Sequence, residues 1–188
     1  MARERAPRRR FTATEFELMA QAGILAEDDR VELIDGEVRQ MRPIGDRHYA
    51  CVVRLGDLFW QRVGQSVLLS VQNPVSLGAY DEPQPDIVLL PRGEQYPTAK
   101  PRPDEILLLI EVADTPLEYD QGEKLAMYAR ANIQEVWVVD LLNGVVTGYC
   151  SPRPARGDYQ IILRRTRAQA LAPRFATGCE FRVEEILG

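Results

Sequence analysis

The stretch Pro103–Ala113, with the sequence PDEILLLIEVA, decides how the rest of the chain is arranged. Its apolar run is unbroken over the length of one strand, which is typical of a strand buried on both faces of a mixed or parallel sheet. The run is too short to cross a membrane. Glu111 is a carboxylate near its far end, and an unpaired buried charge is costly. Two explanations are open: a salt bridge or an exposed strand end, and a bound metal ion.

The composition is that of an ordinary globular protein. The chain has 188 residues, of which 45% are hydrophobic and 27% charged, which is enough for one domain with a substantial core. The net charge of −5 lacks the overall basic character of many nucleic-acid-binding proteins, although a local basic face would suffice. We expect one domain over residues 12–188 and a flexible basic tail over residues 1–11, whose arginines are either solvated or in contact with phosphates.

The cysteines and the N-terminus indicate a cytoplasmic protein. Cys51, Cys150 and Cys179 are far apart and include no Cys-x-x-Cys pair, so neither a disulfide framework nor a zinc ribbon is expected. The N-terminal arginines are not followed by an apolar segment, so we predict neither a secretion signal nor association with a membrane.

Hydrophobic periodicity, capping residues and turn dipeptides predict the order of the elements. The N-terminal half is expected to contain a helix over 12–22, an Asp-Gly hairpin over 30–41, a helix from Asp46 to 63, and strands over 67–71, 75–77 and 86–90. The C-terminal half is expected to contain a strand over 106–113, a helix starting at 115–118 or at 120–123 and ending near 131, strands over 135–140, 145–150 and 159–163, and a helical turn over 183–187. This order predicts a central mixed sheet flanked by helices, an α/β fold that borders on α+β.

Three charged residues are predicted to lie close together. Asp86 opens one apolar strand, Glu111 lies near the end of the next long one, and Lys124 falls in the helix that follows. If the two strands are neighbours, the two carboxylates converge on one cation, and such hard oxygen ligands favour Mg²⁺ or Mn²⁺ with waters completing the shell. A lysine that faces this ion would position or activate a water molecule.

Other polar residues have less specific signals. His48, the one histidine in the chain, is either an exposed or helix-capping residue or an additional ligand or phosphate contact. Glu32 and Glu37 lie on the predicted hairpin, where surface glutamates are common. The sequence contains no Gly-x-x-x-x-Gly-Lys phosphate loop, no Gly-x-Gly-x-x-Gly turn and no Gly-x-Ser-x-Gly elbow. A single histidine without clustered cysteines also argues against a zinc site.

An ordered set of motifs resembles the Uma-type endonuclease family of the PD-(D/E)XK restriction-endonuclease-like superfamily. The motifs, which extend over about residues 12–165, are Glu32-Leu-Ile-Asp-Gly-Glu37-Val, His48, Pro85-Asp86, Glu111-Val-Ala-Asp114, Asp120-x-x-x-Lys124-x-x-x-Tyr128-Ala and Glu135-Val-Trp-Val-Val-Asp140. The resemblance implies a restriction-endonuclease-like core with a divalent-metal site at one edge of the sheet.

The resemblance also assigns roles to individual residues. Asp86 and Glu111 correspond to the metal-binding acidic residues, which would hold Mg²⁺ or Mn²⁺. The lysine usually found in a Glu-x-Lys motif is absent, because position 113 is alanine, and Lys124 would replace it. Glu32, Glu37 and His48 match further family positions.

The leading hypothesis is therefore a metal-dependent endonuclease that hydrolyses phosphodiester bonds of DNA. Arg42 and Arg47, together with Arg54, Arg62 and the N-terminal arginines, would contact the DNA, and pairing of two copies would allow both strands to be cut. Two alternatives stay open: a catalytically silent nuclease-fold protein that binds nucleic acid or a protein partner, and a metal-dependent phosphohydrolase of small phosphate esters.

Overall fold

A computed structural model describes residues 8–26, 28–93, 95–114 and 120–188 of the chain. Its largest element is a six-stranded mixed sheet with the strand order β3-β4-β5-β6-β7-β8. The strands are β3 (Val67–Val71), β4 (Ile87–Pro91), β5 (Leu108–Ala113), β6 (Glu135–Asp140), β7 (Val145–Arg153) and β8 (Asp158–Thr166). Strands β5 and β6 are parallel, and the other neighbouring pairs are antiparallel. The predicted mixed sheet and α/β fold are thereby confirmed.

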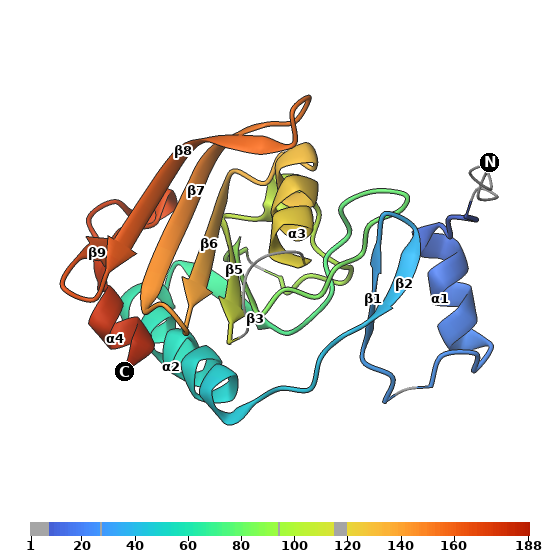
Figure 1. Ribbon diagram of the computed structural model, residues 1–188, viewed down its shortest axis with the longest axis horizontal. Coiled ribbons are helices and arrows are strands. Elements are labelled where there is room, and N and C mark those ends of the chain that lie inside the picture. Colours follow the sequence, from blue (N-terminus) through green and yellow to red (C-terminus); the bar gives the residue numbers. More distant parts are fainter. Residues whose placement is uncertain (1–7, 27, 94, 115–119) are drawn as a thin grey trace, which may run out of the picture.

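Helices cover both faces of this sheet (Figure 1). Helices α2 (Asp46–Val63) and α4 (Val183–Leu187) pack on one face, and α3 (Asp120–Arg130) packs on the other. Because side chains alternate along a strand, Ile110 of β5 joins the core beneath α2, whereas Leu109 joins the core beneath α3. Burying each such side chain stabilises the fold by about 1.5–3 kcal/mol, which explains the unbroken apolar sequence of β5.

A hairpin and helix α1 lie beside the sheet (Figure 1). They consist of α1 (Ala13–Gln21), β1 (Val31–Ile34) and β2 (Glu37–Gln40). Thr12 caps α1 through the predicted capping box. Asp35 and Gly36 have φ angles of 51° and 73°, as the tight two-residue turn requires. An antiparallel bridge between Leu33 and Glu82 fastens the hairpin to the segment that precedes β4.

Some local predictions were wrong. Residues 75–77 do not form a strand, because their backbone N–H groups bond to three separate acceptors, the carbonyls of Pro83, Pro101 and Asp81. Helix α2, by contrast, begins at Asp46 and ends at Val63 as predicted, and its N-cap is Gly45.

The C-terminal third contains more strand than predicted. Strands β7 and β8 continue toward each other and shorten the predicted loop between them to a turn. The short elements β9 (Ala170–Leu171) and β10 (Phe181–Arg182) and the 3₁₀ turns Pro103–Glu105 and Arg174–Ala176 were not predicted. Elements of two or three residues are too short to produce a periodic pattern.

Two predictions reach beyond the described residues. The earlier of the two predicted starts of the helix before Lys124 falls on residues 115–118, outside the described part, whereas the later start agrees with α3. Residues 1–7 of the predicted basic tail also lie outside it. Within the described ranges, no helix has both the length and the apolar character needed to span a membrane.

Candidate active site

Glu111 lies on the face of β5 that is covered by α3. It shares this face with Leu109, because residues two apart on a strand point the same way. Its Oε1 atom accepts a hydrogen bond of 2.5 Å from the Tyr128 hydroxyl and lies 3.4 Å from the Lys124 ammonium. Lys124 and Tyr128 are four residues apart on α3 and therefore face the strand together. The helix thus supplies two of the groups that hold Glu111.

Lys124 joins the hairpin to this site. Its Nζ atom lies 2.8 Å from Oε2 of Glu32, which is a buried residue of β1. The same carboxylate oxygen accepts a hydrogen bond of 3.2 Å from the backbone N–H of Gln84. Burial alone would lower the pKa of Lys124, but the carboxylates of Glu111 and Glu32 raise it above its ordinary value. Lys124 is therefore a fixed cation, and Glu32 is not a surface residue.

Asp86 completes the group from the residue before β4. The backbone N–H of Val112 donates to its Oδ2 atom over 2.8 Å, and the Gln72 amide donates to its Oδ1 atom over 3.3 Å. The Nε2 atom of His48, which lies in the first turn of α2, is 3.0 Å from the carboxylate. This hydrogen bond raises the pKa of His48. The predicted proximity of Asp86 to β5 is correct, because β4 and β5 are neighbours.

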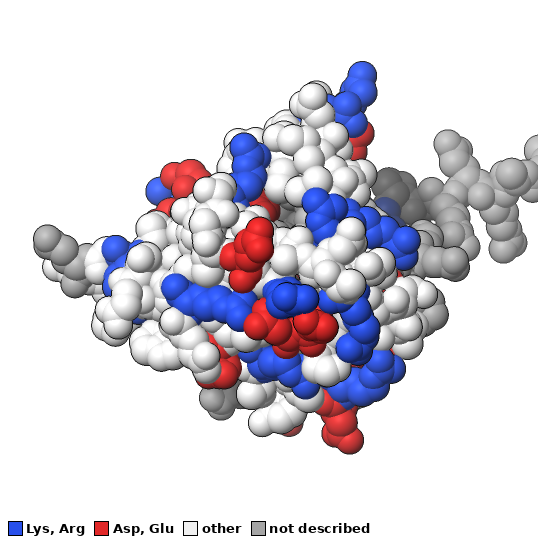
Figure 2. Space-filling model, turned by 90° about the vertical axis from the view of Figure 1, so that its left-hand side faces the viewer, with Lys and Arg blue, Asp and Glu red and all other residues white. Residues whose placement is uncertain are grey.

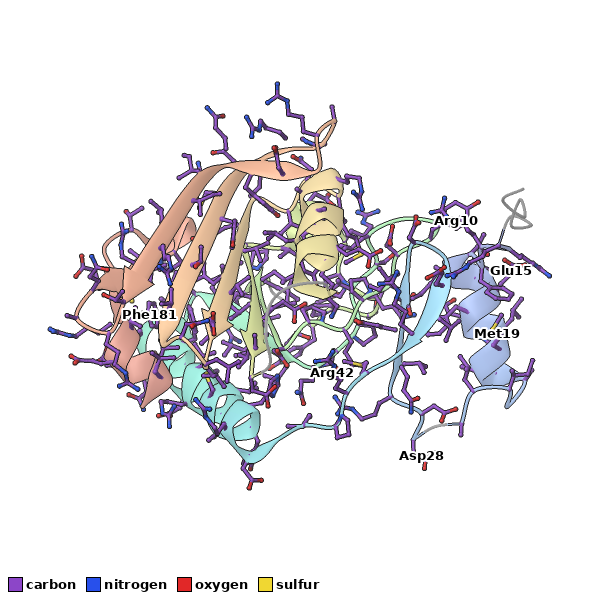
Figure 3. All side chains as sticks on the ribbon, viewed as in Figure 1. Arg10, Glu15, Met19, Asp28, Arg42 and Phe181 are labelled. Carbon is purple, nitrogen blue, oxygen red and sulfur yellow. The ribbon has the colours of Figure 1, made fainter. Side chains whose placement is uncertain are left out.

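These side chains line one cavity of about 250 Å³. The hairpin, β5, α3 and the start of α2 form its walls, and Val136 and Val138 of β6 lie at its base. Arg42 also lines it, from the segment that joins the hairpin to α2 (Figure 3). The Nδ1 atom of His48 is buried and has no hydrogen-bond partner among the described residues.

Carboxylates are concentrated at the buried centre of the cavity. Burial raises the pKa of Glu111 to about 7, Lys124 acts in the opposite direction, and Asp86 raises it further. Asp114, Arg30, Arg39 and Arg42 also line the cavity, so its Asp and Glu side chains equal its Lys and Arg side chains in number. Glu32, Asp86 and Glu111, however, lie around Lys124 at the buried centre. Such an arrangement favours a cation or the protonation of one carboxylate.

The donor set is small. Within the described ranges, no group of three or more His, Cys, Asp or Glu side chains is arranged to hold a metal ion. Mg²⁺ is commonly bound by one or two carboxylates, with water and substrate phosphate as its other ligands. Asp86 and Glu111 therefore fit a Mg²⁺ ion or a Mn²⁺ ion, but not a closed structural metal site.

Two of the candidate residues lie outside the cavity. Glu37, at the tip of the hairpin, pairs with Arg8 over 2.8 Å and with Arg39 over 3.4 Å. It is on the same face of the hairpin as Glu32 but at its far end. Arg47 is in the first turn of α2, and its guanidinium donates to the Leu141 carbonyl over 2.6 Å.

Sequence reasoning gave no role to several residues that hold the site together. Tyr128 was part of a quoted motif, and its spacing of four residues from Lys124 could have identified it as a contact of Glu111. Gln72 and Gln84 follow β3 and precede β4, and no periodicity links them to the site. Their contacts depend on how the loops fold.

Comparisons with known proteins identify a family and a similar fold. The sequence profile of the Uma2 family, described as "Putative restriction endonuclease", matches residues 13–184. A comparison with curated proteins finds no match. The fold is similar to a crystal structure described as "a putative nuclease belonging to DUF820" from Anabaena variabilis ATCC 29413, with a TM-score of 0.73 and 15% sequence identity. The similarity covers 94% of this chain and 97% of that one.

Proposed function

The chain belongs to the Uma2 family, and we propose that it is a metal-dependent endonuclease that hydrolyses phosphodiester bonds of DNA. The observation that carries this proposal is the buried group of Glu32, Asp86, Glu111 and Lys124 around one cavity. Buried charges are costly to keep, and a residue with a strongly shifted pKa in a cavity is a candidate for chemistry. The family to which the chain belongs is described as "Putative restriction endonuclease", and we therefore propose phosphodiester hydrolysis as this chemistry.

We assign the metal site to Asp86 and Glu111. Their oxygen atoms suit Mg²⁺ or Mn²⁺, which when bound would lower the pKa of a water and neutralise charge on the phosphate. The backbone N–H of Val112 and the imidazole of His48 fix the Asp86 carboxylate, and the Tyr128 hydroxyl fixes that of Glu111. The protein thus holds both carboxylates in place before a ligand arrives.

We assign Lys124 to the stabilisation of the reacting phosphate. Its ammonium is a compact cation that can face the charge developing on phosphate oxygens or orient the attacking water. Glu32 holds this ammonium at 2.8 Å, so the position of the charge does not depend on a flexible side chain alone. In this proposal Lys124 of α3 takes the role of the lysine that the Glu-x-Lys motif would place on β5, where position 113 is alanine.

A plasmid-nicking assay tests the proposal. Supercoiled DNA is incubated with the protein in Mg²⁺, in Mn²⁺ and in EDTA, and the nicked and linear forms are quantified. We expect cleavage with either metal, none in EDTA, and loss of cleavage in Lys124→Ala. The matched control is Lys100→Ala, because Lys100 also pairs with two carboxylates but lies outside the cavity. Equal cleavage by the wild type and Lys124→Ala would overturn the site, and no cleavage by the wild type would favour a binding protein.

We also propose that the protein acts in the cytoplasm. Cys51 and Cys150 are buried free thiols, and Cys179 is a partly buried one, which suits a reducing compartment. A homodimer that cuts both strands remains part of the proposal, and sedimentation with and without DNA would test it.

A further inference from the structure

A second cavity, of about 160 Å³, lies between α2, the β6–β7 turn and α4. Arg47, Arg54 and Arg167 line it, together with apolar residues that include Leu141 and Leu187. None of the described residues that line it is acidic. Three guanidinium groups around one small cavity make it a candidate site for an anion.

The three arginines are held in place by backbone oxygen atoms, of which that of Gly188 belongs to the carboxyl group of the last residue. Arg47 donates to Leu141, Arg54 donates to Ile186 over 3.1 Å, and Arg167 donates to Gly188 over 3.2 Å. In the described part of the chain, none of the three forms a salt bridge with a side-chain carboxylate. Since a guanidinium carries five N–H donors, each arginine keeps donors for a further acceptor.

The carboxylates of Asp140 and Glu184, which lie near the cavity in the chain, bind groups other than its three arginines. Asp140 accepts the N–H groups of Leu142 and Asn143 over 3.1 and 3.0 Å and so closes the β6–β7 turn. Glu184 pairs with Arg182 over 2.8 Å. Neither carboxylate neutralises the arginines of the cavity.

The surrounding surface has mixed charge. Figure 2 shows basic and acidic side chains interleaved on the side of the molecule that carries α4 and β9. Arg62, farther along α2, illustrates this pattern, because it pairs with Glu185 over 2.6 Å and lies over the Phe181 ring. The three arginines of the cavity, which form no salt bridge with a side-chain carboxylate of the described residues, therefore make a local site and are not part of a broad basic face.

The second cavity lies next to the candidate active site. Arg47 directly precedes His48, which bonds to Asp86. Leu141, which follows β6, donates its backbone N–H to the Ala113 carbonyl at the end of β5 over 2.8 Å. Both cavities therefore adjoin the carboxyl-terminal ends of β5 and β6.

We propose that Arg47, Arg54 and Arg167 bind a phosphate group of the DNA backbone next to the bond that is cut. This inference rests on the proposed function and adds a second point of contact to it. Arg47 and Arg167 are exposed and Arg54 is half-buried, so a polymer lying across the surface can reach all three. A backbone phosphate held here would fix the position of the strand without reading its sequence.

The test measures DNA binding separately from cleavage. A fluorescein-labelled 20-base-pair duplex is titrated in EDTA at several salt concentrations, and binding is followed by fluorescence anisotropy. We expect Arg54→Gln and Arg167→Gln each to weaken binding about 5- to 20-fold and to reduce the salt slope by about one. The matched control is Arg156→Gln, an exposed arginine of the β7–β8 turn, which should change affinity less than about twofold.

Two further measurements exclude simpler explanations. Arg54 also contacts the end of α4, so Arg54→Lys, which keeps the charge, should retain the salt slope, and thermal unfolding checks that each variant is folded. Inorganic phosphate is the second probe. If it stabilises the wild type but not Arg54→Gln, while DNA affinity is the same in both proteins, the site binds a small phosphate and the DNA-backbone assignment is overturned.

The outcomes also separate this site from the proposed catalysis. If Arg54→Gln and Arg167→Gln weaken DNA binding but the wild type does not nick DNA, the arginine cavity is a DNA phosphate site and the proposed nuclease activity is overturned. If the wild type nicks DNA, and Arg54→Gln and Arg167→Gln bind and cleave DNA as the wild type does, the nuclease activity stands and the arginine site is overturned. Equal losses in these variants and in Arg156→Gln would reduce the site to general surface charge and overturn it.

Discussion

The two lysines of the chain, Lys100 and Lys124, are each paired with two carboxylates, yet they serve different regions of the molecule. Lys100 lies 2.6 Å from Glu17 of α1 and 2.7 Å from Glu82, next to the hairpin. The Glu17 side chain is 49% exposed, so part of that charge is screened by water. Lys100 joins peripheral elements and, with Glu17 and Glu82, lines a separate cavity of about 970 Å³.

Around Lys124 the charges are confined. The side chains of Glu32 and Glu111 are only 10% and 13% exposed, and Asp86 lies within the same cavity. Carboxylates outnumber the lysine, and water can do little to screen them. The comparison indicates that the two clusters differ in burial and not in pairing, because each lysine contacts two carboxylates. The Lys124 cluster also has a third carboxylate, Asp86, within the same cavity.

The largest expected contrast is between Glu111→Gln and Glu82→Gln. Glu111→Gln removes a metal-binding oxygen charge in our proposal, and we expect DNA nicking in Mg²⁺ to fall about 100- to 1,000-fold. Glu82→Gln affects only the Lys100 cluster and should leave the rate within about twofold. The rates come from supercoiled-plasmid time courses, and similar losses in both variants would erase the distinction between the clusters.

A smaller contrast is expected for the outer carboxylates. Glu32→Gln weakens the hold on Lys124, and we expect nicking to fall about 10- to 30-fold, because a misplaced catalytic group loses part of its effect. Glu17→Gln makes the equivalent change at Lys100 and should not alter nicking. A Glu32→Gln protein with the wild-type rate would show that Lys124 does not need Glu32 as an anchor.

Tyr128→Phe should have a modest effect. It removes one hydrogen bond to Glu111 and is expected to reduce nicking about 3- to 10-fold, which corresponds to about 1 kcal/mol. Tyr159→Phe is the matched control, because its hydroxyl donates to the Ile133 carbonyl over 3.0 Å outside the cavity. That control should lower thermal stability slightly and leave nicking unchanged. A reversed pattern would assign Tyr128 to the core alone.

The smallest effect concerns stability in EDTA. Because burial raises the pKa of Glu111 from 4.5 to about 7, the native state binds more protons than the unfolded state between these values. The contribution of Glu111 to stability is therefore greatest at low pH and declines as the pH rises through this window. In Glu111→Gln this decline should be absent, so the variant should become more stable relative to the wild type as the pH rises from 5 to 8. Urea unfolding at a series of pH values measures the free energy of unfolding of both proteins. The same pH dependence in the wild type and in Glu111→Gln would contradict this prediction.

The sequence predicted the main sheet because its strands have strong local signals. The apolar run of β5, the Asp-Gly turn of the hairpin and the spacing of α3 each act over a few residues. The closeness of Asp86, Glu111 and Lys124 followed from these signals, since neighbouring strands and a connecting helix leave little freedom. Assigning those residues to catalysis is still a prediction.

The remainder of the candidate site depends on contacts between distant segments. Glu32 and Glu37 have equally ordinary sequence surroundings, yet Glu32 reaches Lys124 and Glu37 does not. The difference arises from their places along the hairpin, because Glu32 lies near its base and contacts Lys124, whereas Glu37 lies beside the turn and pairs with Arg8 and Arg39. No periodic pattern encodes such docking. The arginine cavity was hidden for the same reason, because Arg167 is far from α2 in sequence.

The position of the hairpin beside the sheet affects when the candidate active site forms during folding. Glu32 is carried by a two-stranded unit, and isolated hairpins are only marginally stable. Glu32 would separate from Lys124, while the six-stranded sheet stayed folded, only if the hairpin opened as a unit. Such opening would break the Leu33–Glu82 bridge together with the Arg39–Glu123 ion pair to α3. Amide hydrogen exchange at Leu33 would then report how often the site comes apart. The contact between Glu32 and Lys124 would then be the last part of the candidate site to form in folding and the first to be lost on heating.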